Sequence, residues 1–316
     1  KDFKSEEEKR EYMLYLDGSN SWILKPLNFI YNLNDKAFFL NSDHTFEDAG
    51  TTIEIIRRAF ENSKNIRKSD VNSKAILIKE FVDEKNAKKI KEEKEKYLKL
   101  SAKFSCNDLH LELKNEDCQK FSKDSIMQLI MIYAQYKTYG KFNSVYEAVD
   151  MREYEFGRTE CVRPLSVEAV DFVKLLDKFE DKQEIQDALE IANNEHKNRI
   201  KSAKKAQGVD RHLFGLKQMI QKADDKTKKD ALEFFNSMGY EKLSQNFIST
   251  TCTGTLDFIG YLLFTPVVWE GLGVTYLKTN DEVIYLISYH EKQKENAKNF
   301  AKYLNEGVEK FKKIYS

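Results

Sequence analysis

The chain has 316 residues, in which 52 Lys and Arg balance 52 Asp and Glu. The zero formal net charge argues against a nucleic-acid binder that relies on a broad basic field, and 21 Phe with 16 Tyr argue against intrinsic disorder. The longest apolar stretch, residues 261–269, is too short to span a bilayer. Four cysteines without a Cys-x-x-Cys spacing favour a reducing compartment, and mitochondrial, peroxisomal and cytoplasmic locations all stay open.

The first third of the chain predicts a helix, a hairpin and two further helices. Residues 1–17 are charged and compatible with a helix, and strands at 27–33 and 37–41 are joined by a polar turn. A helix follows from about residue 49, and the polar segment 63–74 is interpreted as a linker. A short strand at 76–79 and a charged helix over 83–104 come next. We therefore expect two domains, 1–74 and 75–316.

The second domain predicts a mixture of helices and strands without strict alternation. Its first helix runs from Ser122, the expected N-cap, to Tyr136, and Asp124 lies at the positive end of that helix. Further helices are predicted at 166–179, 182–206, 210–223, 226–238 and 296–313, and strands at 247–251, 261–264, 273–276 and 282–289. This mixture predicts layers of the α/β or α+β type. Of the two, we expect an α/β protein in which helices pack on a two-layer mixed sheet.

One histidine stands where chemistry is expected. His44 follows a predicted strand, and Asp48 comes four residues later at the start of a predicted helix. An imidazole at such a junction suits general base work near neutral pH. The spacing alone is more typical of a surface histidine beside an acidic first turn.

Several segments become informative when they are read together and in order. The chain carries Asn20-Ser-Trp22-Ile-Leu-Lys25, Asp43-His44-Thr-Phe-Glu-Asp48-Ala, Tyr146-Glu147, Gly157-Arg158-Thr159-Glu-Cys-Val-Arg163, Asp210-Arg211-His212-Leu-Phe-Gly215-Leu, Ser249-Thr250-Thr251 and Phe264-Thr-Pro266-Val-Val-Trp-Glu-Gly271-Leu-Gly273-Val-Thr-Tyr276. This ordered set resembles the carnitine/choline O-acyltransferase family along nearly the whole chain, and most closely its carnitine members. The resemblance implies a chloramphenicol-acetyltransferase-like domain preceded by the end of a second such domain.

The resemblance implies reversible acyl transfer between coenzyme A and carnitine, with acyl-CoA as co-substrate and no permanently bound cofactor or metal. His44 matches the general base and Asp48 the carboxylate beside it. Thr251 stands where the family has the last Ser of its Ser-Thr-Ser motif, beside the reacting centre. The transfer is direct, so no nucleophilic Ser or Cys is needed.

Carnitine recognition is expected from a cation together with hydroxyl groups. Arg211 matches the family's partner of the carnitine carboxylate, and Tyr146, Thr159 and Ser249 match the hydroxyl-bearing positions. Phe264 matches the aromatic ring that faces the trimethylammonium group. Without the family pattern, an Arg211–Asp210 surface pair, a turn-capping Thr159 and a core Tyr146 would be the ordinary interpretations.

The acyl and CoA sites are expected from fewer residues. Leu262 stands at the position that gates the family's acyl pocket, and its bulk predicts short acyl groups. Lys114, Lys120 and Asp124 are the candidates for CoA binding, with Lys123 as an alternative phosphate partner. A solvated basic face would explain these lysines equally well.

The chain departs from the family in length, since it matches the C-terminal half alone. A missing N-terminal half or a second chain is therefore expected to complete the active-site tunnel. Two alternatives to a carnitine acyltransferase stay open: an inactive relative that serves as a binding or scaffold protein, and a choline acetyltransferase, which Arg211 and Thr159 disfavour.

Overall fold

The computed structural model describes residues 3–16, 26–34, 36–65, 82–254 and 258–315. The chain divides into two compact units, residues 1–105 with 257–260 and residues 106–256 with 261–316. The predicted domain boundary near residue 74, the strand at 76–79 and the Asn20–Lys25 motif lie outside the described residues. The boundary therefore stays a prediction.

The first unit contains the predicted hairpin and the helices that accompany it. Strands β1 (Leu27–Asn32) and β2 (Ala37–Ser42) pair antiparallel with Leu27 opposite Ser42. Helix α1 (Glu6–Tyr15) begins after Ser5, whose side chain caps the Glu8 amide. Helices α2 (Ala49–Ser63) and α3 (Glu84–Ser101) complete the unit, and the hairpin is confirmed.

The second unit is built on a six-stranded mixed sheet with the order β3-β8-β7-β6-β4-β5. Strands β4 and β6, and β6 and β7, pair in parallel, whereas β4–β5 and β7–β8 pair antiparallel. The strands are β3 (Phe104–Glu112), β4 (Val145–Asp150), β5 (Thr159–Val162), β6 (Ile248–Cys252), β7 (Leu272–Lys278) and β8 (Glu282–His290).

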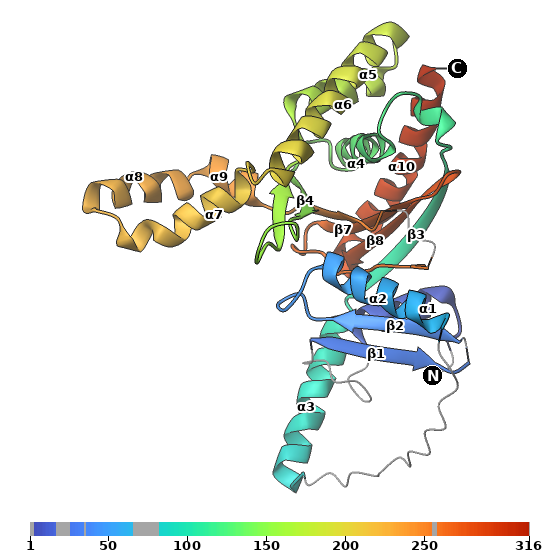
Figure 1. Ribbon diagram of the computed structural model, residues 1–316, viewed down its shortest axis with the longest axis vertical. Helices are drawn as coiled ribbons and strands as arrows, with labels where there is room; N and C mark the ends of the chain where they lie inside the picture. The colour runs from blue at the N-terminus through green and yellow to red at the C-terminus, as the bar shows by residue number, and fades with distance from the viewer. Residues whose placement is uncertain (1–2, 17–25, 35, 66–81, 255–257, 316) are drawn as a thin grey trace. The chain divides into compact units, whose positions relative to one another are not determined.

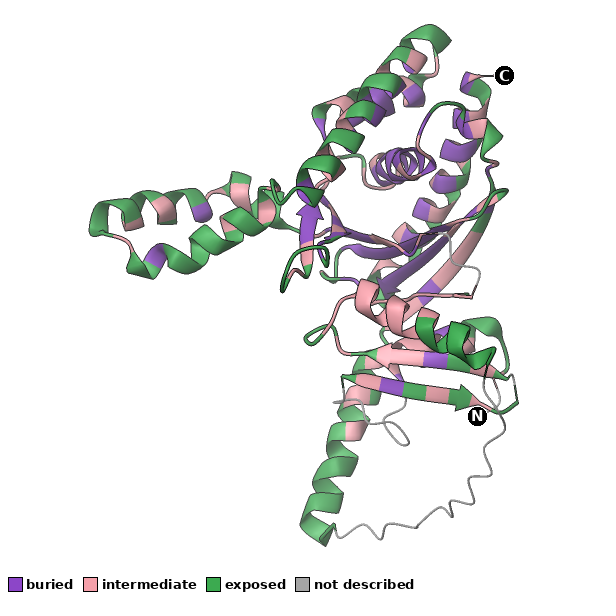
Figure 2. Ribbon diagram, in the orientation of Figure 1, coloured by how far each residue is buried: buried purple, intermediate pink, exposed green. Residues whose placement is uncertain are grey.

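Helices cover one face of this sheet, and three more extend away from it (Figure 1). The helices are α4 (Lys123–Tyr139), α5 (Val167–Lys178), α6 (Lys182–Lys204), α7 (Asp210–Met219), α8 (Asp225–Phe235), α9 (Met238–Ser244) and α10 (Lys294–Ile314). Figure 2 shows that α4 is buried over most of its length, whereas α7, α8 and α9 are mostly exposed. Among the described residues, no helix combines the length and apolar character that a bilayer crossing needs.

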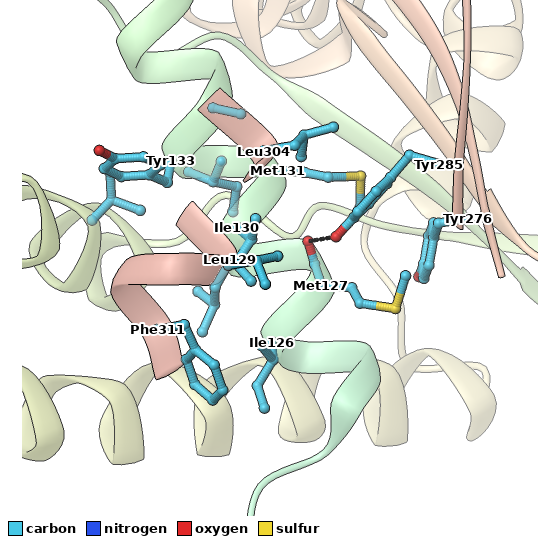
Figure 3. Packing of buried hydrophobic residues seen from close by; sticks show 14 of the residues in the cluster. Ile126, Met127, Leu129, Ile130, Met131, Tyr133, Tyr276, Tyr285, Leu304 and Phe311 are labelled. Atoms are coloured by element: carbon cyan, nitrogen blue, oxygen red, sulfur yellow. Dashed lines mark hydrogen bonds between the residues drawn. The ribbon is translucent and has the colours of Figure 1, made fainter. Parts of the chain in front are cut away.

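The core lies between the sheet and α4, with α10 packed beside α4. Helix α4 is buried on all sides from Ser125 to Gln135, which is typical of a central helix. Its Met127 carbonyl accepts a hydrogen bond from Tyr285 of β8 at 3.5 Å (Figure 3). A Cβ at Gly307 of α10 would lie 3.1 Å from Ile130 and Tyr133, so a glycine lets the two helices approach closely.

The expected α/β class with a mixed sheet and packed helices is confirmed. The predicted strand at 261–264 is wrong, because this segment forms no strand. Both sides of β7 and β8 are already paired within the sheet, so a further strand would have to join an outer edge. The sequence prediction also missed β3, β4, β5 and α9, and it extended the charged helix to 104, whereas α3 ends at Ser101.

Candidate active site

The face of the sheet opposite α4 gathers most of the predicted carnitine residues. Successive side chains of a strand point to opposite faces, and Glu147 of β4 bonds to Gln128 of α4, so Tyr146 points the other way. Tyr146 pairs in register with Ser249 of β6, which therefore shares its face. Asp150 lies four residues after Tyr146 on β4 and so points to the same face, and Thr159 of β5 shares that face because it pairs in register with Asp150.

Arg211 joins this group from the first turn of α7. Its Nη2 donates to the Tyr146 hydroxyl at 3.2 Å and to the Thr159 hydroxyl at 3.4 Å. Its Nε donates to the Thr159 carbonyl at 3.3 Å, and Nη1 lies 3.4 Å from Asp210. The structure thus brings three predicted residues into direct contact. The Arg211 side chain stays 41 % exposed, so a ligand can reach the guanidinium.

Glu160, which sequence reasoning passed over, fixes the start of α7. Its buried carboxylate accepts the backbone N–H of Arg211 at 3.2 Å and that of Cys161 at 2.7 Å. A carboxylate at a helix N-terminus satisfies orphan amides and complements the helix dipole. A Cβ at Gly208 would lie 2.4 Å from Glu160, so only glycine leaves room for this cap. The sequence held one indication of this role, since Glu160 lies within the Gly157–Arg163 segment, directly after Thr159.

Arg163 ends the Gly157–Arg163 segment, and no role was predicted for it from the sequence. Its guanidinium donates to Asp210 at 2.7 Å and to Asn246 at 2.8 Å, and it lies 5.6 Å from the Tyr146 ring centroid. Asp210 is therefore shared by two arginines. The predicted alternative of an Arg211–Asp210 pair is present as well, but it coexists with the contacts to Tyr146 and Thr159.

A cavity of about 330 Å³ opens beside this group. Tyr146, Arg163 and Arg211 line it together with residues of α7 and α9. Three cations, including Lys217, face a single carboxylate, Asp210, so the lining favours an anion. Burial raises the pKa of the Tyr146 hydroxyl, although nearby Arg211 opposes the shift, and the phenol stays neutral at physiological pH.

Phe264 lies over the sheet rather than within it. The Ser288 hydroxyl donates to the Phe264 carbonyl at 2.5 Å, and a Cβ at Gly273 would lie 3.0 Å from the Phe264 ring. Gly273 pairs in register with Ser249, so the ring lies against the strand beside that serine. Leu262 lies two residues earlier and is half-buried, and its predicted role at the acyl pocket stays a prediction.

Thr251 follows Ser249 by two residues on β6 and shares its face of the sheet. It is half-buried and pairs in register with Thr275 of β7. Its predicted place beside the reacting centre stays a prediction.

His44 and Asp48 lie in the first unit, at the start of α2. The Nδ1 of His44 lies 2.9 Å from the Glu47 carbonyl and 3.4 Å from the Asp48 carboxylate. Two acceptors at Nδ1 favour the tautomer with its proton there, which leaves the Nε2 lone pair for a substrate proton. The imidazole is 81 % exposed within the described residues.

The predicted CoA residues carry internal partners. Lys120 lies 2.6 Å from Glu190, and Lys114 lies 3.8 Å from Glu112. Lys123 is buried and donates to the Thr279 carbonyl at 2.8 Å, so its ammonium ties α4 to the end of β7. Asp124 points into the protein, where it accepts a hydrogen bond from Tyr276.

The chain is similar to known proteins along nearly its whole length. Residues 2–306 match the family described as choline/carnitine O-acyltransferase. A Mycoplasma pneumoniae protein, provisionally named as an acetyltransferase, is 26 % identical over 92 % of this chain and 49 % of its own length. Carnitine O-acetyltransferase of Columba livia is 29 % identical over 60 % of this chain and 30 % of its own.

Mitochondrial carnitine O-palmitoyltransferase 2 of Bos taurus is 25 % identical over 94 % of this chain and 46 % of its own. The chain spans about half the length, or less, of these relatives. The family match covers nearly every residue of the chain, including all the segments that form the site, and this chain belongs to the choline/carnitine O-acyltransferase family.

Proposed function

We propose that the protein transfers an acyl group between coenzyme A and carnitine. The observation that carries the proposal is the convergence of Arg211, Tyr146 and Thr159. A guanidinium flanked by two hydroxyl groups suits a carboxylate, because charge-assisted bonds give both affinity and orientation. Carnitine carries a carboxylate and choline does not, which favours carnitine as the acceptor.

The proposed chemistry assigns a role to His44 and to Thr251. His44 removes the proton from the carnitine hydroxyl, whose oxygen attacks the thioester carbon. The tetrahedral oxyanion collapses, the C–S bond breaks, and the CoA thiolate takes the proton back from the imidazolium. Thr251 offers a hydroxyl to the oxyanion, a type of contact worth about 3 kcal/mol in comparable sites.

Phe264 and Leu262 are proposed to select the substrates. The Phe264 ring offers its face to the trimethylammonium group, a cation–π contact worth about 0.5–2 kcal/mol. Leu262 is proposed to close the acyl pocket to long chains. The relatives include both acetyl- and palmitoyltransferases, so the family match alone does not assign a chain length.

Thiol release from acetyl-CoA, followed with a thiol-reactive dye, tests the proposal. Carnitine-dependent release is expected from the folded protein, with choline giving much less. His44→Ala should abolish it, while His110→Ala, which removes a half-exposed imidazole of β3, serves as the matched control. A folded protein that releases no thiol with L-carnitine would instead support a binding or scaffold role.

A further inference from the structure

A buried polar cluster lies on the helix-covered side of the sheet, directly behind Tyr146. It contains Asp124 and Gln128 of α4, Glu147 of β4, His196 of α6 and Tyr276 of β7. Gln128 and Tyr276 are fully buried, and Glu147 is 6 % exposed. The carboxylate and imidazole atoms of Asp124, Glu147 and His196 lie within 4.8 Å of one another. Two carboxylates so close together in the interior cannot both carry a charge without a large cost.

The hydrogen bonds require one additional proton. The Tyr276 hydroxyl contacts both carboxylates, Glu147 through a short hydrogen bond and Asp124 at 3.1 Å. A phenol has a single proton and can donate it to only one of them. The other carboxylate must therefore be protonated and donate to the phenol oxygen.

The surroundings decide which carboxylate holds the proton. Asp124 lies 3.4 Å from the His196 Nε2 and 3.8 Å from the Lys278 ammonium, so a hydrogen-bonding ring and a cation favour its charged form. Glu147 receives a neutral amide donor from Gln128 at 2.8 Å. Burial and the charge of Asp124 raise the pKa of Glu147 to about 8, whereas His196 and Lys278 outweigh burial and lower that of Asp124. The proton chain thus runs from Glu147 to Tyr276 to Asp124.

This cluster is connected to the candidate active site through the backbone of β4. Gln128 also donates to the Thr250 hydroxyl at 3.0 Å, and that hydroxyl donates to the Tyr146 carbonyl at 2.9 Å. Glu147 pairs in register with Thr250. The same bonds that hold Glu147 therefore fasten β4 to β6 at the residue that contacts Arg211.

We propose that Glu147 is a positioning residue whose carboxyl proton keeps Tyr146 and Arg211 arranged for a carboxylate ligand. Loss of that proton leaves two adjacent buried anions. Their repulsion, and the missing donor to Tyr276, displace β4 and with it the Tyr146 hydroxyl. Binding of carnitine then weakens in the alkaline range through a group that never touches the ligand. This inference rests on the proposed function for the identity of the ligand.

Other titratable groups also face Glu147 and Asp124. Within the cluster these groups are His196 and Tyr276, and around it they are Cys252 of β6, Tyr285 of β8 and Lys278 of β7. Burial raises the pKa of the Cys252 thiol to about 12 and raises the pKa of both phenols, so these three stay protonated at pH 9. Their charge therefore does not change over the pH range of the test.

Calorimetric titration with L-carnitine at pH 6.5 and pH 9 tests the proposal. With a Glu147 pKa of about 8, about a tenth of the protein keeps the proton at pH 9, and the apparent affinity should fall about tenfold. Glu147→Gln supplies a permanent donor of the same shape and should change by less than about twofold over this range. Glu233→Gln, on the exposed face of α8, is the matched control and should behave like the unmodified protein.

Hydrogen exchange of the peptide that contains β4 supplies a readout that needs no ligand. After correction for intrinsic rates, protection of residues 145–150 should fall between pH 6.5 and pH 9 in the unmodified protein and persist in Glu147→Gln. Constant protection of β4 in the unmodified protein would overturn the proposal, even if the variant fails to fold. Absence of carnitine binding at pH 6.5 alongside the expected exchange would instead contradict the proposed function alone. An equal loss of affinity in both proteins would overturn the role of Glu147.

Discussion

At the scale of single residues, the site depends on side chains that orient other side chains. Arg211, Tyr146 and Thr159 were expected from the resemblance to the family rather than from their residue types, and the structure places them in contact. Glu160 and Arg163 were missed, because their roles depend on contacts with α7 and α9 that no spacing reveals. Sequence patterns thus identified the groups expected to touch a ligand better than those that hold them in place.

Glu160→Ala should weaken both the fold and the site. The Arg211 amide at the start of α7 and the Cys161 amide of β5 lose their acceptor, and loss of a helix cap costs about 0.5–2 kcal/mol. Arg211 should become mobile, so carnitine affinity falls as well. Urea unfolding and calorimetry measure the two effects, with Glu233→Ala on the exposed face of α8 as a control. Unchanged stability and affinity would show that the carboxylate does not hold α7.

At the scale of elements, the errors in prediction have a common cause. Strand β4 presents Glu147 to the core and Tyr146 to the open face, so its sequence lacks the usual alternation of apolar and polar residues. The four-residue β5 likewise buries Glu160. Conversely, residues 261–264 are apolar enough to suggest a strand, yet they lie over the sheet with Phe264 against Gly273. Buried polar residues in β4 and β5 therefore hid the strand pattern in the sequence.

Gly273→Ala should separate Phe264 from the sheet. The added methyl would lie 3.0 Å from the Phe264 ring and 2.5 Å from the Ser288 hydroxyl. The neighbouring strands hold the backbone of Gly273, so the ring has to move instead. Affinity for the trimethylammonium group should fall, by up to the roughly 0.5–2 kcal/mol of a cation–π contact. Calorimetry with L-carnitine measures this, and Gly260→Ala, which meets open space, is the control. Equal affinity in both variants would remove Phe264 from the binding site.

At the scale of the whole molecule, the order of the motifs was more informative than any one of them. His44-x-x-x-Asp48 alone does not distinguish a base from a surface histidine, and Arg211 alone does not distinguish a binding residue from a surface ion pair. The family match over residues 2–306 places both in one sequence context. The α/β class was predictable from the mixture of patterns, whereas the strand order required the structure.

The stability of the molecule should depend on pH through Glu147. Its folded pKa of about 8 lies above the ordinary value of 4.5, so the folded state retains a proton that the unfolded state releases. The stabilisation that this proton gives the folded state is complete below about pH 4.5 and is lost as pH rises through 8. Each unit of difference between the folded and unfolded pKa is worth about 1.4 kcal/mol. Urea midpoints of the unmodified protein should fall relative to Glu147→Gln between pH 5 and pH 8. Parallel curves would contradict this assignment.

The most direct measurement is a calorimetric comparison of L-carnitine and choline binding to the unmodified protein and to Arg211→Gln. Loss of a charge-assisted bond worth about 1.5–3 kcal/mol should weaken carnitine binding by about tenfold or more, and choline binding should change little. Arg152→Gln, an exposed arginine that pairs with Asp150, should leave both affinities unchanged. Equal carnitine affinity with and without Arg211 would contradict the account of this site.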